Sequence, residues 1–278
     1  MGKFKQNIKE RPIRTIGKIL LLLFIVVDVS RALGVSFEIP FQYRKDLSRI
    51  GQPTYMIYYG ELNDTIIEKA KQYDIVVLHP DAGNTTREQV ERIQEGGACV
   101  FGYISIGEDQ RTNGMTPEQM LEDARFTGDK TGPRIDPRDD KTEDLAIENL
   151  LGDVSPVGGG YASYYLDDND HDGKPDFNPN FNCAYTNIGD PAWFDVLDAM
   201  RIDDVDKIAG IREILTKEYG RGLGCDGLFL DTIDTCAPNV YTSDEEPNRT
   251  RFEWTAPGVI KFMERLRERY PDKYILQN

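Results

Sequence analysis

No apolar run in the sequence is long enough to cross a lipid bilayer. The longest extends from Ile19 to Val27, nine residues where a spanning helix needs roughly 20. Asp28 ends this run, and six basic residues precede it: Lys3, Lys5, Lys9, Arg11, Arg14 and Lys18. This pattern, with small residues at positions 32 and 34, is typical of a secretory signal peptide. We therefore expect residues 1–35 to be a signal peptide with an N-terminal extension, and the rest to be secreted without a stable membrane span.

Basic residues are also in short supply. The 33 Lys and Arg residues stand against 48 Asp and Glu residues, which gives a formal net charge of −15. Without residues 1–35, 26 basic and 46 acidic side chains remain, a net charge of −20. Such a surface disfavours nucleic acid and anionic membranes as partners and favours cationic ones through long-range attraction. Solubility alone is another reason for an acidic surface, so the charge does not prove a cationic partner.

Cysteine and histidine are scarce, with four and two residues respectively. An exported chain can form disulfides, but four cysteines do not establish any. Cys225 and Cys236 are separated by a predicted strand of about 20 Å, which is too far for a bridge. We therefore expect Cys183, which also lies in a loop after a strand, to be the better partner for Cys236. Cys99 opens an apolar strand and is expected to be a buried free thiol.

Apolar runs that alternate with helical patterns predict a parallel α/β sheet. We expect six strands, at Tyr55–Tyr59, Ile75–His79, Cys99–Ile106, Tyr185–Ile188, Leu228–Leu230 and Tyr274–Gln277. Helical periodicity is found between them, at residues 63–71, 86–95, 191–219 and 255–270. Residues from about 109 to 160 are mostly polar, with one short helix at 116–125, and are expected to form a loop insertion over one face. Disorder of this segment is the alternative.

Two fold classes fit this pattern. Six strands form part of an eight-stranded (β/α)8 TIM-type barrel, in which case the sequence is truncated and continues beyond Asn278. A strand as the last element favours this interpretation, because its neighbour and covering helix are missing. The alternative is an open doubly wound parallel sheet that is complete as given. We expect a single domain over residues 36–278, with an acidic loop at 167–180.

Two acids mark the end of the fifth predicted strand. Asp231 and Asp234 follow the apolar residues Leu228–Leu230. A carboxylate at the end of a buried strand is partly desolvated, which suits it to proton transfer or nucleophilic attack. The alternative is that Asp231 caps the following turn or helix, as acids after strands often do.

Several motifs together resemble glycoside hydrolase family 114, the endo-α-1,4-polygalactosaminidases and their relatives. The resemblance covers Tyr55 to Asn278, and its motifs occur in the order seen in that family. They are Tyr58–Gly60, Tyr73–Val77, Gly102–Glu108, Gly224–Asp234 and Ile275–Asn278, with Tyr161–Asp167 and Gly189–Trp193 similar to one branch of the group. The two best motifs, around Tyr103–Glu108 and Asp226–Asp234, are fairly specific in combination and weak singly.

The resemblance implies a TIM-barrel glycosidase that acts on α-1,4-linked, galactosamine-rich polysaccharide. This polymer is cationic where it is not N-acetylated, which agrees with the acidic domain. Asp231 matches the catalytic aspartate of the family at a strand end. The second essential acid of the family is a glutamate that follows the residue matched by Asn278, and it is absent from this sequence. Either half of the catalytic pair is missing, as in a glycan-binding protein that has lost catalysis, or Glu108 supplies the second acid.

Glycoside hydrolysis requires one carboxylic acid to protonate the leaving oxygen and one carboxylate to attack or to activate water. Glu108 and Asp231 both follow strands of the predicted parallel sheet, so in a barrel they emerge at the same rim. Neighbouring side chains that could contact substrate are Tyr59, His79, Tyr103 and Asp234. Each has a structural alternative: core packing for Tyr103, a satisfied strand-end position for His79, and loop capping for Asp234. The reaction requires no cofactor.

The acidic loop resembles the first half of a calcium-binding loop. Its oxygen ligands would be Asp168, Asp170, Asp172 and Asp176, with a glycine at the sixth position. It departs from the EF-hand because Pro179 replaces the bidentate glutamate and no helix clearly precedes it. We expect either a structural calcium site or an acidic surface turn. A metal-dependent phosphohydrolase built on this loop and Asp231 is a third function class.

Overall fold

The computed structural model describes residues 47, 51–81, 84–128, 160–167, 172–203, 205–237 and 252–278. All of them belong to the compact unit Lys45–Asn278. The predicted signal peptide and most of the loop insertion, residues 129–159, lie outside the described residues. Within the described ranges, no helix is both long enough and apolar enough to cross a membrane.

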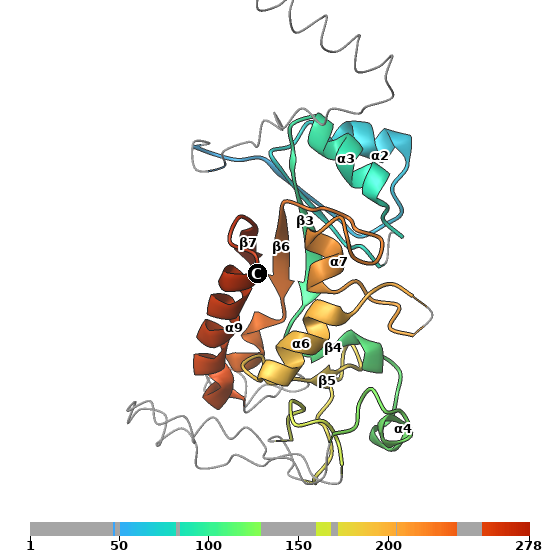
Figure 1. The fold of residues 1–278 in the computed structure, drawn as a ribbon, viewed down its shortest axis with the longest axis vertical. Coiled ribbons are helices and arrows are strands. Elements are labelled where there is room, and N and C mark those ends of the chain that lie inside the picture. The colour runs from blue at the N-terminus through green and yellow to red at the C-terminus, as the bar shows by residue number, and fades with distance from the viewer. Residues whose placement is uncertain are drawn as a thin grey trace, which may run out of the picture. The chain divides into compact units, whose positions relative to one another are not determined.

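Five parallel strands form the main sheet. Their order is β1 (Tyr55–Tyr58), β2 (Ile75–Leu78), β3 (Cys99–Ser105), β6 (Gly227–Asp231) and β7 (Tyr274–Gln277). Helices lie in the connections: α2 (Asp64–Ala70), α3 (Arg87–Glu95), α6 (Pro191–Ala199), α7 (Ile211–Leu215) and α9 (Ala256–Arg269), as Figure 1 shows. The predicted parallel α/β sheet is therefore confirmed.

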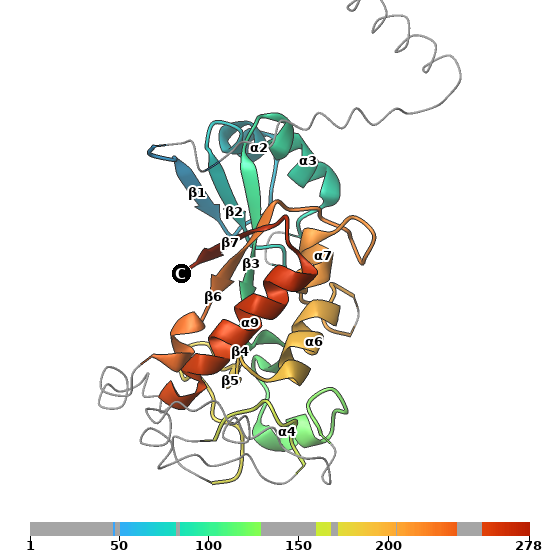
Figure 2. The same cartoon turned by 60° about the vertical axis from the view of Figure 1, so that its left-hand side comes forward.

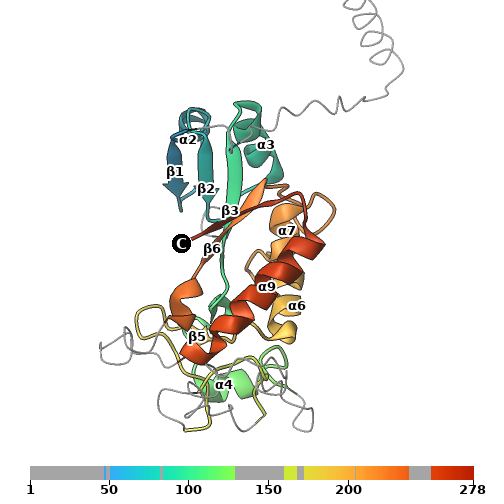
Figure 3. The ribbon, with the colours of Figure 1, turned by 90° about the vertical axis from the view of Figure 1, so that its left-hand side faces the viewer.

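The strand order runs one way through the sheet. It lacks the reversal that defines a doubly wound sheet, so the described strands do not form that alternative. Right-handed crossovers between successive neighbours place their helices on the same face, and α3, α7 and α9 lie on one side of the sheet (Figures 2 and 3). Among the described residues, β1 and β7 each pair on one side only, so a closed barrel is not seen.

One predicted strand is in the wrong place. The stretch Tyr185–Ile188 was expected to join the main sheet, but only Ala184–Tyr185 forms a strand there, β5. It pairs antiparallel with β4 (Glu108–Asp109), beyond the C-terminal ends of β3 and β6 (Figure 1). The main sheet in the described residues therefore has five strands and not six.

Local sequence signals fix the helix starts. Thr86 and Gln89 form a capping box at α3, in which the Thr86 hydroxyl accepts from the Gln89 amide at 3.3 Å and Gln89 Oε1 accepts from the Thr86 amide at 2.9 Å. Asn63 caps α2 with a single side-chain hydrogen bond, accepting from the Ile66 amide at 3.0 Å. The helix predicted at 116–125 is present but shorter than expected: α4 spans Pro117–Leu121.

The two faces of the sheet bury different side chains. On the helix side, Val100, Ile104, Leu228 and Leu230 pack with residues from α2, α3, α7 and α9. On the other side, a smaller cluster is built from Val77, Cys99, Phe101, Tyr103 and Phe229. Adjacent strand residues point to opposite faces, so Tyr103, Phe229 and Asp231 share the second face. This alternation places the strand-end acid over the smaller cluster.

The expected disulfide between Cys183 and Cys236 is wrong, because both thiols are free. Cys183 Sγ lies 3.4 Å from the Phe181 carbonyl oxygen, and Cys236 Sγ lies 3.1 Å from that of Ile233. Each thiol thus donates within its own loop. Cys99 is buried and free, as expected.

Close backbone packing between α9 and the segment before α6 requires two glycines. A Cβ on Gly258 would lie 2.6 Å from the Gly189 Cα. We expect Gly258→Ala to lower the free energy of unfolding by about 1–2 kcal/mol, since the clash outweighs the better helix propensity of alanine. Urea unfolding measures this, with Gly51→Ala as the control because no atom lies within 4 Å of that added Cβ. Equal stability of the two variants would contradict the packing argument.

Candidate active site

Asp231 ends β6 and is held by its two neighbouring strands. Its Oδ2 accepts a hydrogen bond from the Tyr103 hydroxyl on β3 at 2.7 Å, and its Oδ1 accepts from Asn278 Nδ2, after β7, at 2.7 Å. The carboxylate therefore accepts on both oxygens from uncharged donors. This fixes its orientation at the C-terminal edge of the sheet, where active sites of parallel α/β folds lie.

The next residue, Thr232, ties the end of β6 to the end of β3. It adopts a left-handed conformation, φ +60°, which is unusual for a β-branched side chain. Its hydroxyl oxygen accepts from the Gly107 amide at 2.8 Å and from the Ile106 amide at 3.2 Å. A Cβ at Gly107 would collide with the Thr232 carbonyl oxygen, so the two segments need that glycine. The turn that follows Asp231 is thus joined directly to the segment that carries Glu108.

Glu108 is buried, with 5% of its surface exposed, and its Oε1 accepts from Asn178 Nδ2 at 2.7 Å. Burial raises the pKa of Glu108 to about 7; the charges of Asp234 and Asp231 add to this, and the Asn178 hydrogen bond opposes it. Near neutral pH a large share of the Glu108 side chains therefore carries a proton. One carboxyl group that holds its proton and one that is ionised are the pairing that acid–base catalysis needs.

Three aromatic rings lie beside Asp231. His79 stacks on Tyr103 with ring centroids 4.4 Å apart, and Tyr59 meets both rings edge-on at 5.4 Å. Burial lowers the pKa of His79, against the opposing effect of Asp231, so the imidazole is neutral at neutral pH. Tyr103 is buried and donates to Asp231, whereas Tyr59 is 46% exposed. Of the three, Tyr59 offers the most open ring for a sugar face.

Asp234 lies on the short helix η5 (Ile233–Cys236) and is exposed. Burial raises the pKa of Tyr185 and that of Glu108, and the charge of Asp234 adds to both shifts. The charges of both Asp231 and Asp234 thus act on Glu108.

The expected calcium loop is only partly described. Asp168 and Asp170 lie outside the described residues, so the ligand set stays a prediction. Asp172 is exposed and accepts from the Lys174 amide at 2.9 Å, while Asp176 is partly buried. In the part of the chain that the structure describes, no three His, Cys, Asp or Glu side chains gather closely enough to hold a metal ion.

Sequence reasoning missed several residues that shape the site. Asn178 and Thr232 position the two acids, yet the sequence patterns assign a role to neither, although Thr232 lies within the motif Gly224–Asp234. Asn278 was noted only for its match to the family pattern. Thr232 alone had a signal, since it follows a strand-end acid and occupies the turn. Asn178 reaches Glu108 across 70 positions of sequence, a contact that spacing does not encode.

No protein-family model matches the chain, and no curated protein matches it. Solved structures show a distant likeness. The glycoside hydrolase domain of PelA from Pseudomonas aeruginosa has a TM-score of 0.40 at 18% identity, covering 82% of this chain and 60% of that one. The galactosidase domain of alpha-galactosidase-sucrose kinase, AgaSK, has a TM-score of 0.40 at 15% identity, and the match covers 84% of this chain and 27% of that one. The maltogenic amylase from S. marinus has a TM-score of 0.32 at 12% identity, and the match covers 77% of this chain and 29% of that one. The chain spans less than two thirds of each, and likeness at this level carries no information about its reaction or substrate.

Proposed function

We propose that this protein is a glycoside hydrolase whose catalytic pair is Asp231 and Glu108. The observation that carries the proposal is the joint fixation of the two acids. Asp231 is held by uncharged donors on both oxygens, and Glu108 is buried with a pKa raised to about 7. Thr232 connects their segments through 2.8 and 3.2 Å hydrogen bonds.

In this mechanism Glu108 donates its proton to the leaving glycosidic oxygen as the bond to the anomeric carbon breaks. Asp231 supplies the negative charge, either by attacking that carbon or by removing a proton from the attacking water. One water is consumed, and its proton restores the acid. Tyr103 and Asn278 keep the Asp231 carboxylate aligned throughout. These two carboxyl groups supply the whole reaction, so we propose no cofactor.

We propose α-1,4-linked, galactosamine-rich polysaccharide as the substrate, and a TIM-type barrel as the fold. The one-way strand order supports the barrel. The charge of −20 beyond residue 35 supports a cationic polymer through long-range attraction. The exposed Tyr59 ring supports a sugar ligand. Secretion, proposed from the N-terminal pattern, would bring the domain to extracellular glycans.

The test is the release of reducing ends from de-N-acetylated α-1,4-galactosamine polymer by the full chain. Chitosan, which carries the same ammonium groups on β-1,4-linked sugars, serves as the matched polymer. We expect release from the first and little from the second. Equal release from both would overturn the proposed linkage, and none from either, or from other α-linked glycans, would overturn the hydrolase.

The rate should depend on pH through Glu108. The acid must be protonated in the free enzyme, and its pKa is raised to about 7. We therefore expect kcat/KM to fall tenfold per pH unit, roughly, as the pH rises above that value. A pH–rate profile on neutral oligosaccharide measures this without titrating substrate amines. A profile that stays flat from pH 6 to 9, roughly, would remove Glu108 as the acid.

A second candidate is a glycan-binding protein without catalysis. The burial of Glu108 and its hydrogen bond to Asn178 favour this candidate, because a buried acid contacts substrate only if the residues that cover it move. Calorimetry with the galactosamine polymer distinguishes the two. If the wild-type protein binds the polymer but releases no reducing ends, the second candidate is supported.

A further inference from the structure

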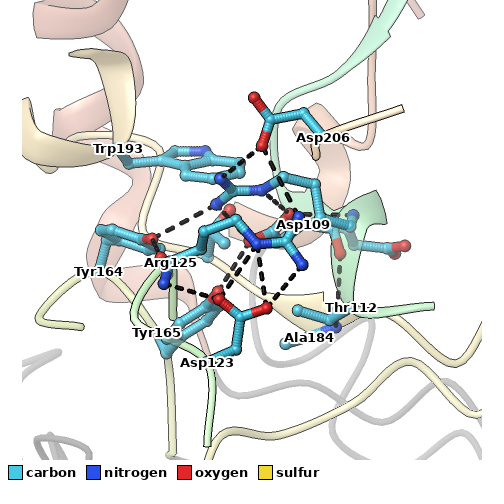
Figure 4. Close-up of polar contacts among 12 residues, drawn as sticks. Asp109, Thr112, Asp123, Arg125, Tyr164, Tyr165, Ala184, Trp193 and Asp206 are labelled. Carbon is cyan, nitrogen blue, oxygen red and sulfur yellow. Dashed lines mark hydrogen bonds and ion pairs between the residues drawn. The ribbon is translucent and has the colours of Figure 1, made fainter. Parts of the chain in front are cut away.

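A buried ion pair lies directly behind the proposed acid. Asp109, the residue after Glu108, is 0% exposed and accepts four hydrogen bonds. Arg111 donates its amide at 3.0 Å, Nε at 2.9 Å and Nη2 at 2.8 Å, and the Tyr165 hydroxyl donates at 2.7 Å (Figure 4). Each oxygen of the Asp109 carboxylate accepts two hydrogen bonds, so the position of the side chain is firmly fixed.

The Arg111 guanidinium is held in turn by several segments. It lies 5.3 Å from the Phe126 ring centroid and 5.9 Å from that of Trp193. Asp206 is 3.7 Å away, and the Tyr164 hydroxyl is 3.5 Å away (Figure 4). The side chain of Arg111 is only 5% exposed. The ion pair is therefore a rigid point in the fold and not a mobile surface contact.

The strand geometry carries this rigidity to Glu108. β4 contains only Glu108 and Asp109, which pair with Tyr185 and Ala184 of β5. Successive side chains on a strand point to opposite faces. Asp109 therefore enters the ion pair while Glu108 faces the opposite side, toward Asn178. Thr112 adds a further tie, since its hydroxyl donates to the Asp109 carbonyl oxygen and accepts from the Ala184 amide at 2.8 Å.

We propose that Asp109 is a positioning residue for Glu108, whose hydrogen bonds to Arg111 and Tyr165 fix β4 and so hold the Glu108 carboxyl buried against Asn178. The proposal rests on the proposed role of Glu108 as the acid. Asp109 touches neither substrate nor the reacting atoms in this scheme. It acts through the backbone of β4, by keeping water away from its neighbour.

Other charged or titratable groups also face Glu108, and the test must keep them unchanged. They are Asp231 and Asp234, together with the electrostatically linked side chains Tyr103, Cys183 and Tyr185. None of them belongs to the Asp109 ion pair. Substitutions within that pair leave these side chains in place, and Tyr165→Phe, which removes only a hydrogen bond to Asp109, leaves every charge in place as well.

The experiment is a carbon-13 NMR titration of the full chain labelled at the glutamate carboxyl carbons, with the Glu108 signal assigned by its loss in Glu108→Gln. We expect Asp109→Asn to lower the Glu108 midpoint by about one pH unit or more, as water reaches the carboxyl. Tyr165→Phe keeps the charges and removes one hydrogen bond, so it should lower the midpoint less. If Asp109→Asn does not fold, Tyr165→Phe decides the question alone.

Asp198→Asn is the matched control. Asp198 is also 0% exposed and paired with arginines, Arg212 and Arg269, but it joins α6 to α7 and α9. It should lose stability without moving the Glu108 midpoint. A Glu108 midpoint that stays unchanged in Asp109→Asn and Tyr165→Phe, or that moves equally in the control, would overturn the positioning role. The titration does not require turnover. If the protein hydrolyses no glycan, the proposed function is contradicted, but the titration still tests whether Asp109 positions Glu108.

Discussion

Substituting Asp231 by Asn is expected to lower kcat/KM for the glycan by about 100- to 10,000-fold, the range for loss of a catalytic carboxylate. An amide has nearly the same size but can neither attack the anomeric carbon nor accept a proton from water. Its carbonyl oxygen can still accept from Tyr103, which donates at 2.7 Å in the wild type. The loss should therefore appear in turnover, with the fold retained.

The matched control for this substitution is Asp195→Asn. Asp195 lies on α6, and its side chain is 70% exposed and 3.8 Å from Arg269. Surface ion pairs of this kind contribute about 0–1 kcal/mol, so activity should match the wild type. Reducing-end release and urea midpoints, measured on both variants, separate chemistry from folding. Retention of wild-type activity by Asp231→Asn would rule out its catalytic role.

Substituting Glu108 by Gln should give a second large loss, one that depends on the leaving group. With the polymer, whose leaving sugar hydroxyl needs a proton, we expect kcat to fall by about 100- to 10,000-fold. With an oligosaccharide that carries a nitrophenol leaving group, the loss should be far smaller, since nitrophenolate leaves without protonation. Glutamine cannot donate the proton but can keep a hydrogen bond with Asn178.

The two variants together assign the roles. Asp231→Asn should be inactive on both substrates, because both need the attacking charge. Glu108→Gln should recover on the nitrophenyl substrate only. Equal losses of Glu108→Gln on the two substrates would remove it from proton donation and leave it a structural residue.

Much of the sheet could be predicted because its signals are local. Ile75–Leu78 and Cys99–Ser105 are continuous apolar runs, and Asn63 and Thr86 are recognisable caps. The prediction of a main-sheet strand at Tyr185–Ile188 is wrong, because the observed strand is Ala184–Tyr185 and it pairs with β4. Two residues carry no periodicity, and their partner strand is set by tertiary packing.

The candidate site was predictable only in part, because local sequence signals do not reveal long-range contacts. Asp231 and Glu108 could be named because parallel strands end at one edge, so sequence position implies proximity. The contacts that hold them are long-range. Tyr103 packs in the smaller cluster, as expected, and it also donates to Asp231 across 128 positions. The prediction of a disulfide between Cys183 and Cys236 is wrong, because the spacing of residues in the sequence does not give the distance between two loops.

The central claim is that Glu108 and Asp231 share one site in which Glu108 holds its proton near neutral pH. A carbon-13 NMR titration of the Glu108 carboxyl, in wild type and in Asp231→Asn, tests it without any substrate. We predict a wild-type midpoint, and therefore a pKa, of about 7, and a lower one in Asp231→Asn, because the Asp231 charge helps to retain the proton. A wild-type midpoint in the ordinary glutamate range of about 4.3, or the same midpoint in both proteins, would contradict the account.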